Sequence, residues 1–396
     1  MRRHYARPFA LFMFIVAALA IVAWAGACTT AEPSADLSAK LTDRSQLAGL
    51  DLSGINMSGK HLNQSDLSGS NLSNCNLRGA FLRSAWLRNS DLANADLTGA
   101  DLDGADLSGA DLQGSDLSGA CLANARMPGA ILNDAVLKKA DLTEADLSDA
   151  SLSDADLNDA RLFRTDLSGA CLQGIYLISA NLIGAHVSWA DMSQSRLSRG
   201  QFSRAELYNT NLTGADLSGA DFTRAYLMGA DLTDASLIGT SLDYADLTGA
   251  KLMGASLSSA KIPYGDLTRA NLTGADLSGA DLNSARLVGC TLRLAVLDRV
   301  RLCEMDLRGV DLSGSSLRGS DLVRVYLANA DMRGADLRDA NLDRVEMTGA
   351  NLSGANLEKV KYDQFTLYSL YNANLEGAKI SGDLSADLSR IKEDGQ

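Results

Sequence analysis

Large apolar residues recur at every fifth position of this chain, from Leu47 to Leu357, without an insertion or a deletion. Of these 63 positions 54 hold leucine, and the residue two places before each is nearly always Ala, Ser, Thr, Gly or Cys. A period of five fits neither the 3.6-residue turn of a helix nor the two-residue repeat of a strand. A chain that turns a corner every five residues does keep both positions on one side. Four right-angle corners of five residues close a square coil of 20 residues.

We call each recurrent apolar residue a centre and number its neighbours −2, −1, +1 and +2. In this geometry the centre and −2 point inward, and the other positions point outward. Glycine is common at +2, and a type II turn needs a positive φ at its third residue. The prolines within the repeats, Pro128 and Pro263, both occupy +1, where the fixed φ of proline suits the same turn. The pattern predicts type II turns at the corners.

One of the four faces departs from this rule. Glycine fills 10, 9 and 8 of 16 positions at +2 on three faces, but only 2 of 16 on the face whose centres are Leu62, Leu82 and every twentieth residue after them. We call this the Leu62 face, and the next one along the chain the Leu67 face. Because Arg and Tyr resist positive φ, we predict that the corner of the Leu62 face has no type II turns. The bulky side chains at +2 on this face are Arg164, Arg204, Arg224, Tyr244, Tyr264, Arg324 and Arg344.

The small side chains at −2 make steric sense, because four leucines nearly fill a narrow square interior. Larger side chains at −2 should therefore bulge the coil locally. They include Ile175, Val300, Met305, Val310 and Val325. Lys60, also at −2, suggests that the first coils are irregular or open to water.

Quintets such as Ala95-Asp96-Leu97-Thr98-Gly99 and Ala275-Asp276-Leu277-Ser278-Gly279 resemble the pentapeptide-repeat family, whose consensus is Ala-(Asp/Asn)-Leu-x-x. The resemblance covers about four fifths of the chain. It implies an all-β fold, a right-handed quadrilateral parallel β-helix, here with about 16 coils of 20 residues between 47 and 367. At roughly 4.8 Å per coil, the rod should be on the order of 75 Å long.

The N-terminus carries a targeting or anchoring signal. A basic stretch precedes an uninterrupted run of apolar or small residues, 9–27, and Ala25-Gly26-Ala27-Cys28 resembles a bacterial lipobox. The resemblance implies a signal peptide, 1–27, that is cleaved before Cys28, and lipidation of the Cys28 thiol. The run is also nearly long enough to span a bilayer, so an uncleaved anchor helix is the alternative. Residues 28–46 are then a tether and N-terminal cap, with a short helix expected from Ser34.

The register breaks near the C-terminus, so we assign 368–396 to a cap and tail. After Leu367 the next plausible centres are Leu375 and Ile380, a shift of three places. An open β-helix end exposes unpaired strands and apolar side chains, so the dense aromatic segment here is interpreted as a cap, with a binding pocket as the alternative. This segment contains Tyr362, Phe365, Tyr368, Leu370 and Tyr371.

The chain is acidic, with a net charge of −13, and most of the acid is aspartate at −1 on all four faces. The simplest interpretation is a soluble surface that resists side-to-side association. The alternative is DNA mimicry, since pentapeptide proteins that protect DNA gyrase resemble acidic rods of duplex-like width. That alternative makes the chain a regulator of a type II topoisomerase. The export signal argues against it, as does the lack of an evident long C-terminal helix for dimerisation. We expect no nucleic-acid partner.

No catalytic, cofactor-binding or metal site is expected. Cys75 and Cys290 occupy −2 and should pack inward, while the outward Cys121 and Cys171 lie on opposite faces and cannot bond within one rod. No cysteine has the spacing of zinc ligands. A solenoid without loop insertions also offers no concave pocket. The sequence therefore favours a protein that is not an enzyme.

Outward aromatic residues cluster on two adjoining faces. Nine of ten lie on the Leu62 and Leu67 faces, and Tyr176 is the exception. Trp, Tyr and Arg are enriched at binding hot spots, so we predict a partner surface there. It comprises Trp189, Arg204, Tyr208, Arg224, Tyr226, Tyr244 and Tyr264, and we call it the aromatic edge. The alternative is a purely structural edge of stacked rings and short-range ion pairs, such as Arg204 with Glu206.

Together these features predict a membrane-tethered scaffold of the bacterial envelope. It would be held by a lipid on Cys28 or by the N-terminal helix, at the outer membrane if the cell has two. Its partner would be a protein that the residues do not identify, and its oligomeric state is left open.

Overall fold

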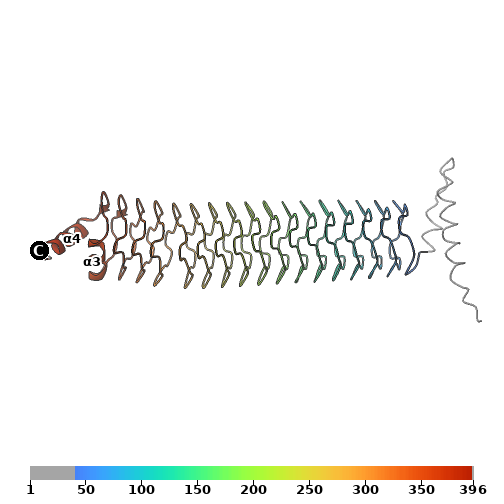
Figure 1. Cartoon of the computed structure of the whole chain (residues 1–396), viewed down its shortest axis with the longest axis horizontal. Coiled ribbons are helices and arrows are strands. Elements are labelled where there is room, and N and C mark those ends of the chain that lie inside the picture. Colours follow the sequence, from blue (N-terminus) through green and yellow to red (C-terminus); the bar gives the residue numbers. More distant parts are fainter. Residues whose placement is uncertain (1–40, 395–396) are drawn as a thin grey trace, which may run out of the picture.

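The computed structural model describes residues 41–394, and they form one straight rod of stacked coils with two helices at its C-terminal end (Figure 1). Each residue at −1 except Arg286 pairs in parallel with the residue twenty places later, from Gln46 with Asp66 to Asn341 with Lys361. The fold is the predicted right-handed quadrilateral β-helix, with twenty residues in each coil. The helix expected from Ser34 lies outside the described residues.

The interior of the rod is a continuous apolar column. Every centre from Leu52 to Leu357 is at most 1 % exposed, and the alanines at −2 pack beside them. Burying a leucine side chain stabilises a fold by roughly 1.5–3 kcal/mol. The column therefore supplies the main stabilising contribution, distributed evenly along the rod. In the first described coil Leu50, Ile55 and Lys60 are half-buried, although its hydrogen-bond ladder is regular.

All four corners carry the same turn, which contradicts our prediction for the Leu62 face. Every residue at +2 from Arg44 to Lys359 has positive φ, including Arg204 at 59° and Tyr244 at 57°. The N–H at +3 donates to the carbonyl of the centre, as in Ala245 to Leu242 at 3.0 Å. These are the marks of type II turns. Arg and Tyr tolerate them because the N–H at +2 also donates to the next coil, which offsets a left-handed cost of about 1–2 kcal/mol.

The aspartates at −1 are part of the coil rather than only a charged coat. Asp96 Oδ1 accepts from the backbone N–H of Thr98 at 3.1 Å and from its hydroxyl at 2.6 Å. The same contact recurs along the rod, for example between Asp51 and the N–H of Ser53. This Asx-type bond satisfies the N–H at +1, which the inter-coil ladder leaves without a backbone acceptor. Much of the net negative charge is therefore a consequence of turn chemistry.

Large side chains at −2 disturb the rod only where they are grouped. Ile175 and Val325 leave the inter-coil hydrogen bonds intact, so the predicted bulge is wrong at both. Val300, Met305 and Val310 lie on three successive faces of one coil, and the ladder beneath that coil is interrupted.

The C-terminal end changes register by insertion of a helix. The strand β1 (Asn356–Leu357) pairs in parallel with β2 (Lys379–Ile380), which lies twenty-three places later instead of the usual twenty. The three extra places come from α3 (Gln364–Tyr371), which replaces one side of the last coil, and the expected boundary at 367 falls inside it. Leu375 and Ile380 do take the centre positions of the resumed coil.

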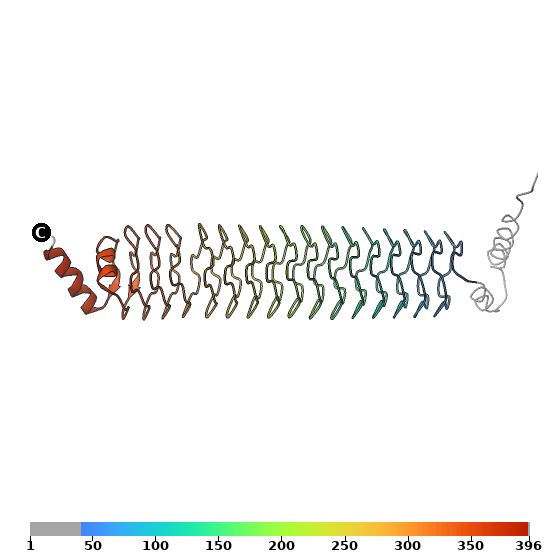
Figure 2. The ribbon, with the colours of Figure 1, turned by 90° about the horizontal axis from the view of Figure 1, so that it is seen from below.

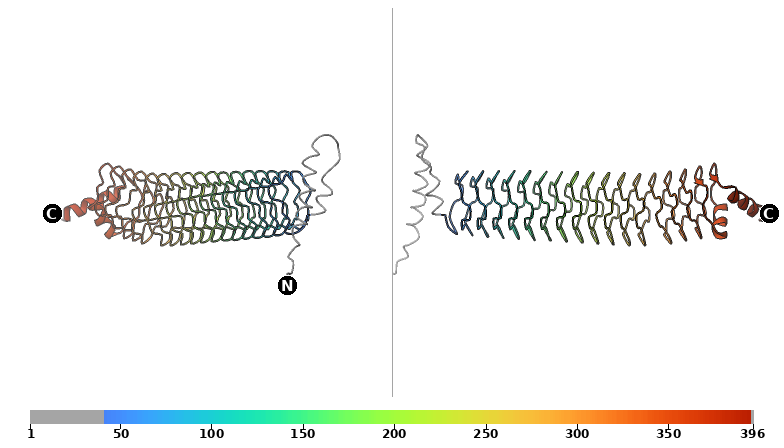
Figure 3. Two further views of the ribbon diagram at one scale, coloured as in Figure 1. Left: turned by 45° about the vertical axis from the view of Figure 1, so that its right-hand side comes forward. Right: turned by 180° about the vertical axis from the view of Figure 1, so that it is seen from behind.

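Helix α4 (Gly382–Asp394) follows β2 and projects past the end of the rod (Figure 3). We expected no such C-terminal helix, because its polar residues outnumber its apolar ones. Leu384 is nonetheless fully buried, and Leu388 and Ile391 pack against the same cluster.

Candidate functional site

The aromatic edge is an exposed strip on adjoining faces of the middle of the rod. Trp189 is 71 % exposed, Tyr244 and Tyr264 are 52 % exposed, and Tyr226 is 43 % exposed. Tyr208 is half-buried. Each of these residues is placed by the coil, because neighbouring coils repeat the same backbone and put equivalent positions in a column. The edge is therefore a rigid array and not a loop.

The corner of the Leu62 face brings four predicted residues into one column, and three of them stack. The rings of Tyr244 and Tyr264 are parallel within 9°, with centroids 4.8 Å apart. The guanidinium carbon of Arg224 lies 5.5 Å from the centroid of the Tyr244 ring. Arg204, Arg224 and Tyr244 line one shallow groove of about 480 Å³. The structure thus forms the ladder that the 20-residue period predicts.

The Leu67 face adds a second aromatic pair beside this corner. The rings of Tyr208 and Tyr226 stack with their centroids 5.8 Å apart. The backbone N–H of Trp189 donates to the backbone carbonyl of Tyr208 at 2.9 Å. His186 Nδ1 lies 3.0 Å from Glu206 Oε2 in the same column. Partial burial, with the charge of Glu206 nearby, raises the pKa of Tyr208 above its ordinary value of 10. All seven predicted residues therefore lie on one connected surface.

The short-range ion pairs proposed for a structural edge do not form. Glu206 contacts His186 instead of Arg204, and in the described rod neither Arg204 nor Arg224 has a carboxylate within ion-pair distance. Arg164 approaches Glu144 of the preceding coil at 3.9 Å rather than Asp166. The corner separates a residue at +2 from the acid two places later, whereas equivalent positions of adjacent coils lie side by side. Within the described rod, neither of these two guanidinium groups therefore forms an ion pair, although Asp243 lines the same groove.

Our sequence reasoning missed some exposed apolar residues. Met228, 42 % exposed, adjoins Tyr226 on the edge, and its outward +1 position could have indicated this. On α3 the cap prediction holds only in part. Thr366, Leu367, Ser369 and Leu370 are buried against the last coil, whereas Phe365, Tyr368 and Tyr371 are 45–53 % exposed. Because residues three apart lie on one side of a helix, these three rings share one face of α3. We extended the repeats to residue 367 and therefore did not predict this face.

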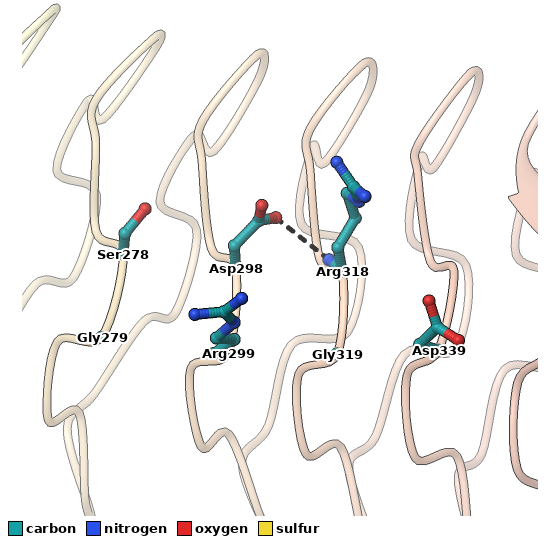
Figure 4. A pocket seen from close by; sticks show the side chains of 7 residues that line it. All are labelled: Ser278, Gly279, Asp298, Arg299, Arg318, Gly319 and Asp339. Carbon is teal, nitrogen blue, oxygen red and sulfur yellow. Dashed lines mark hydrogen bonds between the residues drawn. The ribbon is translucent and has the colours of Figure 1, made fainter.

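A second groove, of about 640 Å³, lies on another corner, nearer the C-terminus (Figure 4). It combines Arg299 and Arg318 with Asp298 and Asp339. Asp298 Oδ1 accepts from the Arg318 N–H at 3.1 Å, so this carboxylate is engaged in holding two coils together. Equal numbers of opposite charges give the groove no preference for an anion or a cation.

The carboxylates of the rod make its stability sensitive to acid. The Arg308 side chain hydrogen-bonds Asp306 and lowers its pKa below the ordinary 3.8, and Arg338 does the same to Asp336. Ten described aspartates have a lowered pKa, and only Asp243, through partial burial, has a raised one.

Because the lowered pKa values lie below those of the unfolded chain, these ten aspartates stabilise the fold above about pH 4, and the contribution disappears as the pH falls through the folded values. Asp243 acts in the opposite sense. We expect the melting midpoint to change little from pH 6 to about pH 4 and to fall steeply below that. Far-UV circular dichroism melts at several pH values measure this. A midpoint that rises between about pH 4 and pH 2.5 would contradict the assignment.

Cys75 and Cys290 are buried as predicted, and burial raises the pKa of their thiols to about 11 and about 12. Among residues 41–394, no group of three His, Cys, Asp or Glu side chains is arranged to hold a metal ion. No helix in that part of the chain is long and apolar enough to cross a membrane. Cys28, the predicted lipidation site, lies outside the described residues.

Comparison with known proteins gives a family and several similar structures. The model "Pentapeptide repeats (8 copies)" matches successive segments from residue 45 to residue 358. HetL, a pentapeptide repeat protein involved in heterocyst differentiation regulation in the cyanobacterium Nostoc, is 39 % identical over 53 % of this chain and 90 % of its own, with a TM-score of 0.32. No curated protein matches the chain.

Two further solved structures are similar to this chain at lower identity. QnrB1, a plasmid-mediated fluoroquinolone resistance protein, is 18 % identical over 59 % of this chain and 96 % of its own, with a TM-score of 0.18. A pentapeptide repeat protein of the Arabidopsis thaliana thylakoid lumen is 26 % identical over 45 % of this chain and 89 % of its own, with a TM-score of 0.13.

Proposed function

Because this chain belongs to the pentapeptide-repeat family, we propose that it is a non-enzymatic, membrane-tethered rod of a bacterial envelope that binds a protein partner along the aromatic edge. The observation that carries the proposal is the stack of Arg224, Tyr244 and Tyr264 on rigid coils. Half-exposed rings that are already ordered lose little side-chain entropy on binding. Tyr and Arg are also the residues in which binding energy is concentrated.

The chemistry of the edge favours a partner with carboxylates or aromatic rings near the contact. Arg204 and Arg224 present guanidinium groups without a carboxylate partner in the described rod, and Trp189 offers a large exposed indole. A guanidinium binds carboxylates in a bidentate manner and stacks on rings. Because the rest of the rod is acidic, these arginines also provide a local contrast in charge that would orient an acidic partner.

The edge is tested by changing two stacked tyrosines to acid. We expect Tyr244→Glu with Tyr264→Glu to reduce cross-linked capture of the partner from envelope fractions at least about tenfold, the effect of losing hot-spot contacts. Tyr176→Glu is the matched control, because Tyr176 also carries a guanidinium over its ring (Arg196, 4.8 Å) but on another face. Unchanged capture by the double variant, with a normal circular dichroism spectrum, would exclude the aromatic edge.

The membrane tether rests on the sequence Ala25-Gly26-Ala27-Cys28. One lipid chain anchors only marginally, but several acyl chains hold a protein firmly. Thr29 after Cys28, in place of aspartate, favours outer-membrane sorting in a cell with two membranes.

Metabolic labelling with a fatty acid, followed by fractionation, tests the tether. We expect label in the membrane fraction for the natural chain and none for Cys28→Ser. An unlabelled membrane protein would indicate the uncleaved helix. An unlabelled soluble protein would favour the alternative, a topoisomerase regulator.

A further inference from the structure

The coils are joined by a regular ladder of backbone hydrogen bonds. On each side of a coil, the N–H groups of the centre and of +2 donate to the next coil, and the N–H at −1 of the next coil donates back. Leu142 to Arg161, Glu144 to Phe163 and Arg161 to Ala140 are one such set, at 2.7–2.9 Å. From Leu47 to Leu337 this pattern holds at every step but one.

The exception lies between residues 280–290 and 300–311, within the described rod. Seven consecutive ladder bonds are missing on the Leu62 and Leu67 faces and at the corner that follows them. The next bond before the gap, from the Gly279 N–H to the Asp298 carbonyl, is stretched to 3.3 Å. The donors without a well-formed ladder bond are the N–H groups of Leu282, Ser284, Leu287, Gly289, Arg301, Asp306 and Asp311. The backbone pairs Asp281 with Arg301 and Thr291 with Asp311 still form, so the ladder is weakened at the ends of the gap and broken at its centre.

The gap is centred on one pair of residues. The backbones of Arg286 and Asp306 should pair in the parallel series, but theirs is the one pair between Gln46 and Asn341 that does not form. Their side chains do not bridge the gap either. Arg286 binds Asp266 of the preceding coil at 2.9 Å, and Asp306 binds Arg308 of its own coil at 2.6 Å. The ribbons separate visibly at this step (Figure 2).

The cause is crowding at −2 on three successive faces. Val300 lies over Ala280, Met305 over Ala285 and Val310 over Cys290, and the bonds donated at −1 beside these pairs are three of the seven that are missing. A single large side chain at −2, as at Val325, is tolerated because the other three sides of its coil keep their spacing. Three in one coil exceed the methyl-sized space that the leucine column leaves.

The interior side chains beside the gap are more exposed to solvent than those elsewhere in the rod. Ala285 is 9 % exposed, Met305 6 % and Ala280 4 %, whereas other interior alanines of the rod are at most 1 % exposed. On the opposite side the ladder persists, with Leu277 bonded to Val296 and Leu292 to Asp311, each at 2.8 Å. An opening confined to two adjacent faces, with intact bonds on the others, has the geometry of a hinge.

We propose that this step is a hinge that divides the rod into two stacks, one up to residue 291 and one from residue 296. The open faces are those that carry the aromatic edge and, beyond the gap, Tyr326 and the exposed rings of α3. Bending at the hinge changes the angle between these two aromatic surfaces. Coils in a solenoid contact only their neighbours, so one weakened step is enough to let the two stacks move and open separately.

Two buried thiols provide an internal test. Cys290 and Cys75 both point inward at −2, but Cys290 adjoins the gap and Cys75 lies in intact ladder. In a chain with its other cysteines changed to serine, we expect a small thiol reagent to modify Cys290 at least tenfold faster than Cys75 under native conditions. Hydrogen exchange should likewise be faster in peptide 280–291 than in peptide 140–151, which occupies the same faces seven coils earlier.

Restoring small residues should close the gap. We expect Val300→Ala, Met305→Ala and Val310→Ala together to slow Cys290 modification and exchange of 280–291, and Met305→Ala alone to do so in part. Ile175→Ala with Val325→Ala is the control and should change neither. Equal protection of Cys290 and Cys75, and of the two peptides, would overturn the hinge. Unchanged rates in the triple variant would overturn its cause.

Discussion

Replacing Leu157 with aspartate is expected to lower the free energy of unfolding by more than about 4 kcal/mol. Leu157 is fully buried in the leucine column, so the change removes roughly 1.5–3 kcal/mol of apolar burial. It also places a carboxyl group where no partner satisfies it, which costs a further few kcal/mol. Urea denaturation followed by circular dichroism measures the loss.

Leu294→Asp is the matched control. Leu294 has the same side chain but points outward at +2 and is 54 % exposed. Aspartate already occupies +2 elsewhere with the same positive φ, as at Asp234. We expect a change within about 0.5 kcal/mol. Similar urea midpoints for the two variants would mean that the column does not hold the rod together.

Gly265→Ala is expected to destabilise the rod by about 1–3 kcal/mol, although alanine is the commonest residue at −2. Gly265 has no positive φ to protect, so backbone strain is not the reason. A methyl group there would lie 2.6 Å from Ile262 Cγ2 and 3.2 Å from the Ile262 carbonyl oxygen. Ile262 is the only isoleucine among the centres, and its branch fills the space that a methyl group at −2 normally takes.

The compensating change is Ile262→Leu. It restores the common centre and frees that space, so we expect Gly265→Ala with Ile262→Leu to be about as stable as the natural chain. A double-mutant cycle should give a coupling energy of about 1–3 kcal/mol. If the two changes were instead additive, the close contact would not explain the glycine. A methyl group at Gly200, the other glycine at −2 in the repeats, would lie 2.6 Å from the ring of Phe202, the centre of its own quintet.

The acidic surface has a structural explanation, and this bears on the choice between functions. Carboxylates at −1 hold the turn N–H groups, so selection for the fold alone would make such a rod negative. Charge by itself therefore does not favour a DNA mimic. The aromatic edge has no comparable role in every coil, since only a few coils carry it. That restriction to one region is why we place the partner there.

Several features of the site could be predicted from the sequence because the coil converts spacing directly into position. The 20-residue period placed Tyr244 over Tyr264 and Tyr208 beside Tyr226, and both pairs stack. Which side chains form ion pairs could not be predicted in the same way. His186 rather than Arg204 binds Glu206, because side-chain torsions, not backbone register, decide which neighbour is reached.

The sequence by itself determined the architecture of this protein, because a strict five-residue period with small side chains at −2 has one packing solution. The tertiary structure decided the rest. It put Arg and Tyr into left-handed turns, because ladder hydrogen bonds outweigh a local backbone preference. It replaced one side of the last coil with α3, and it opened the ladder beneath Val300, Met305 and Val310. In each case the outcome depends on contacts between coils, which no single quintet contains.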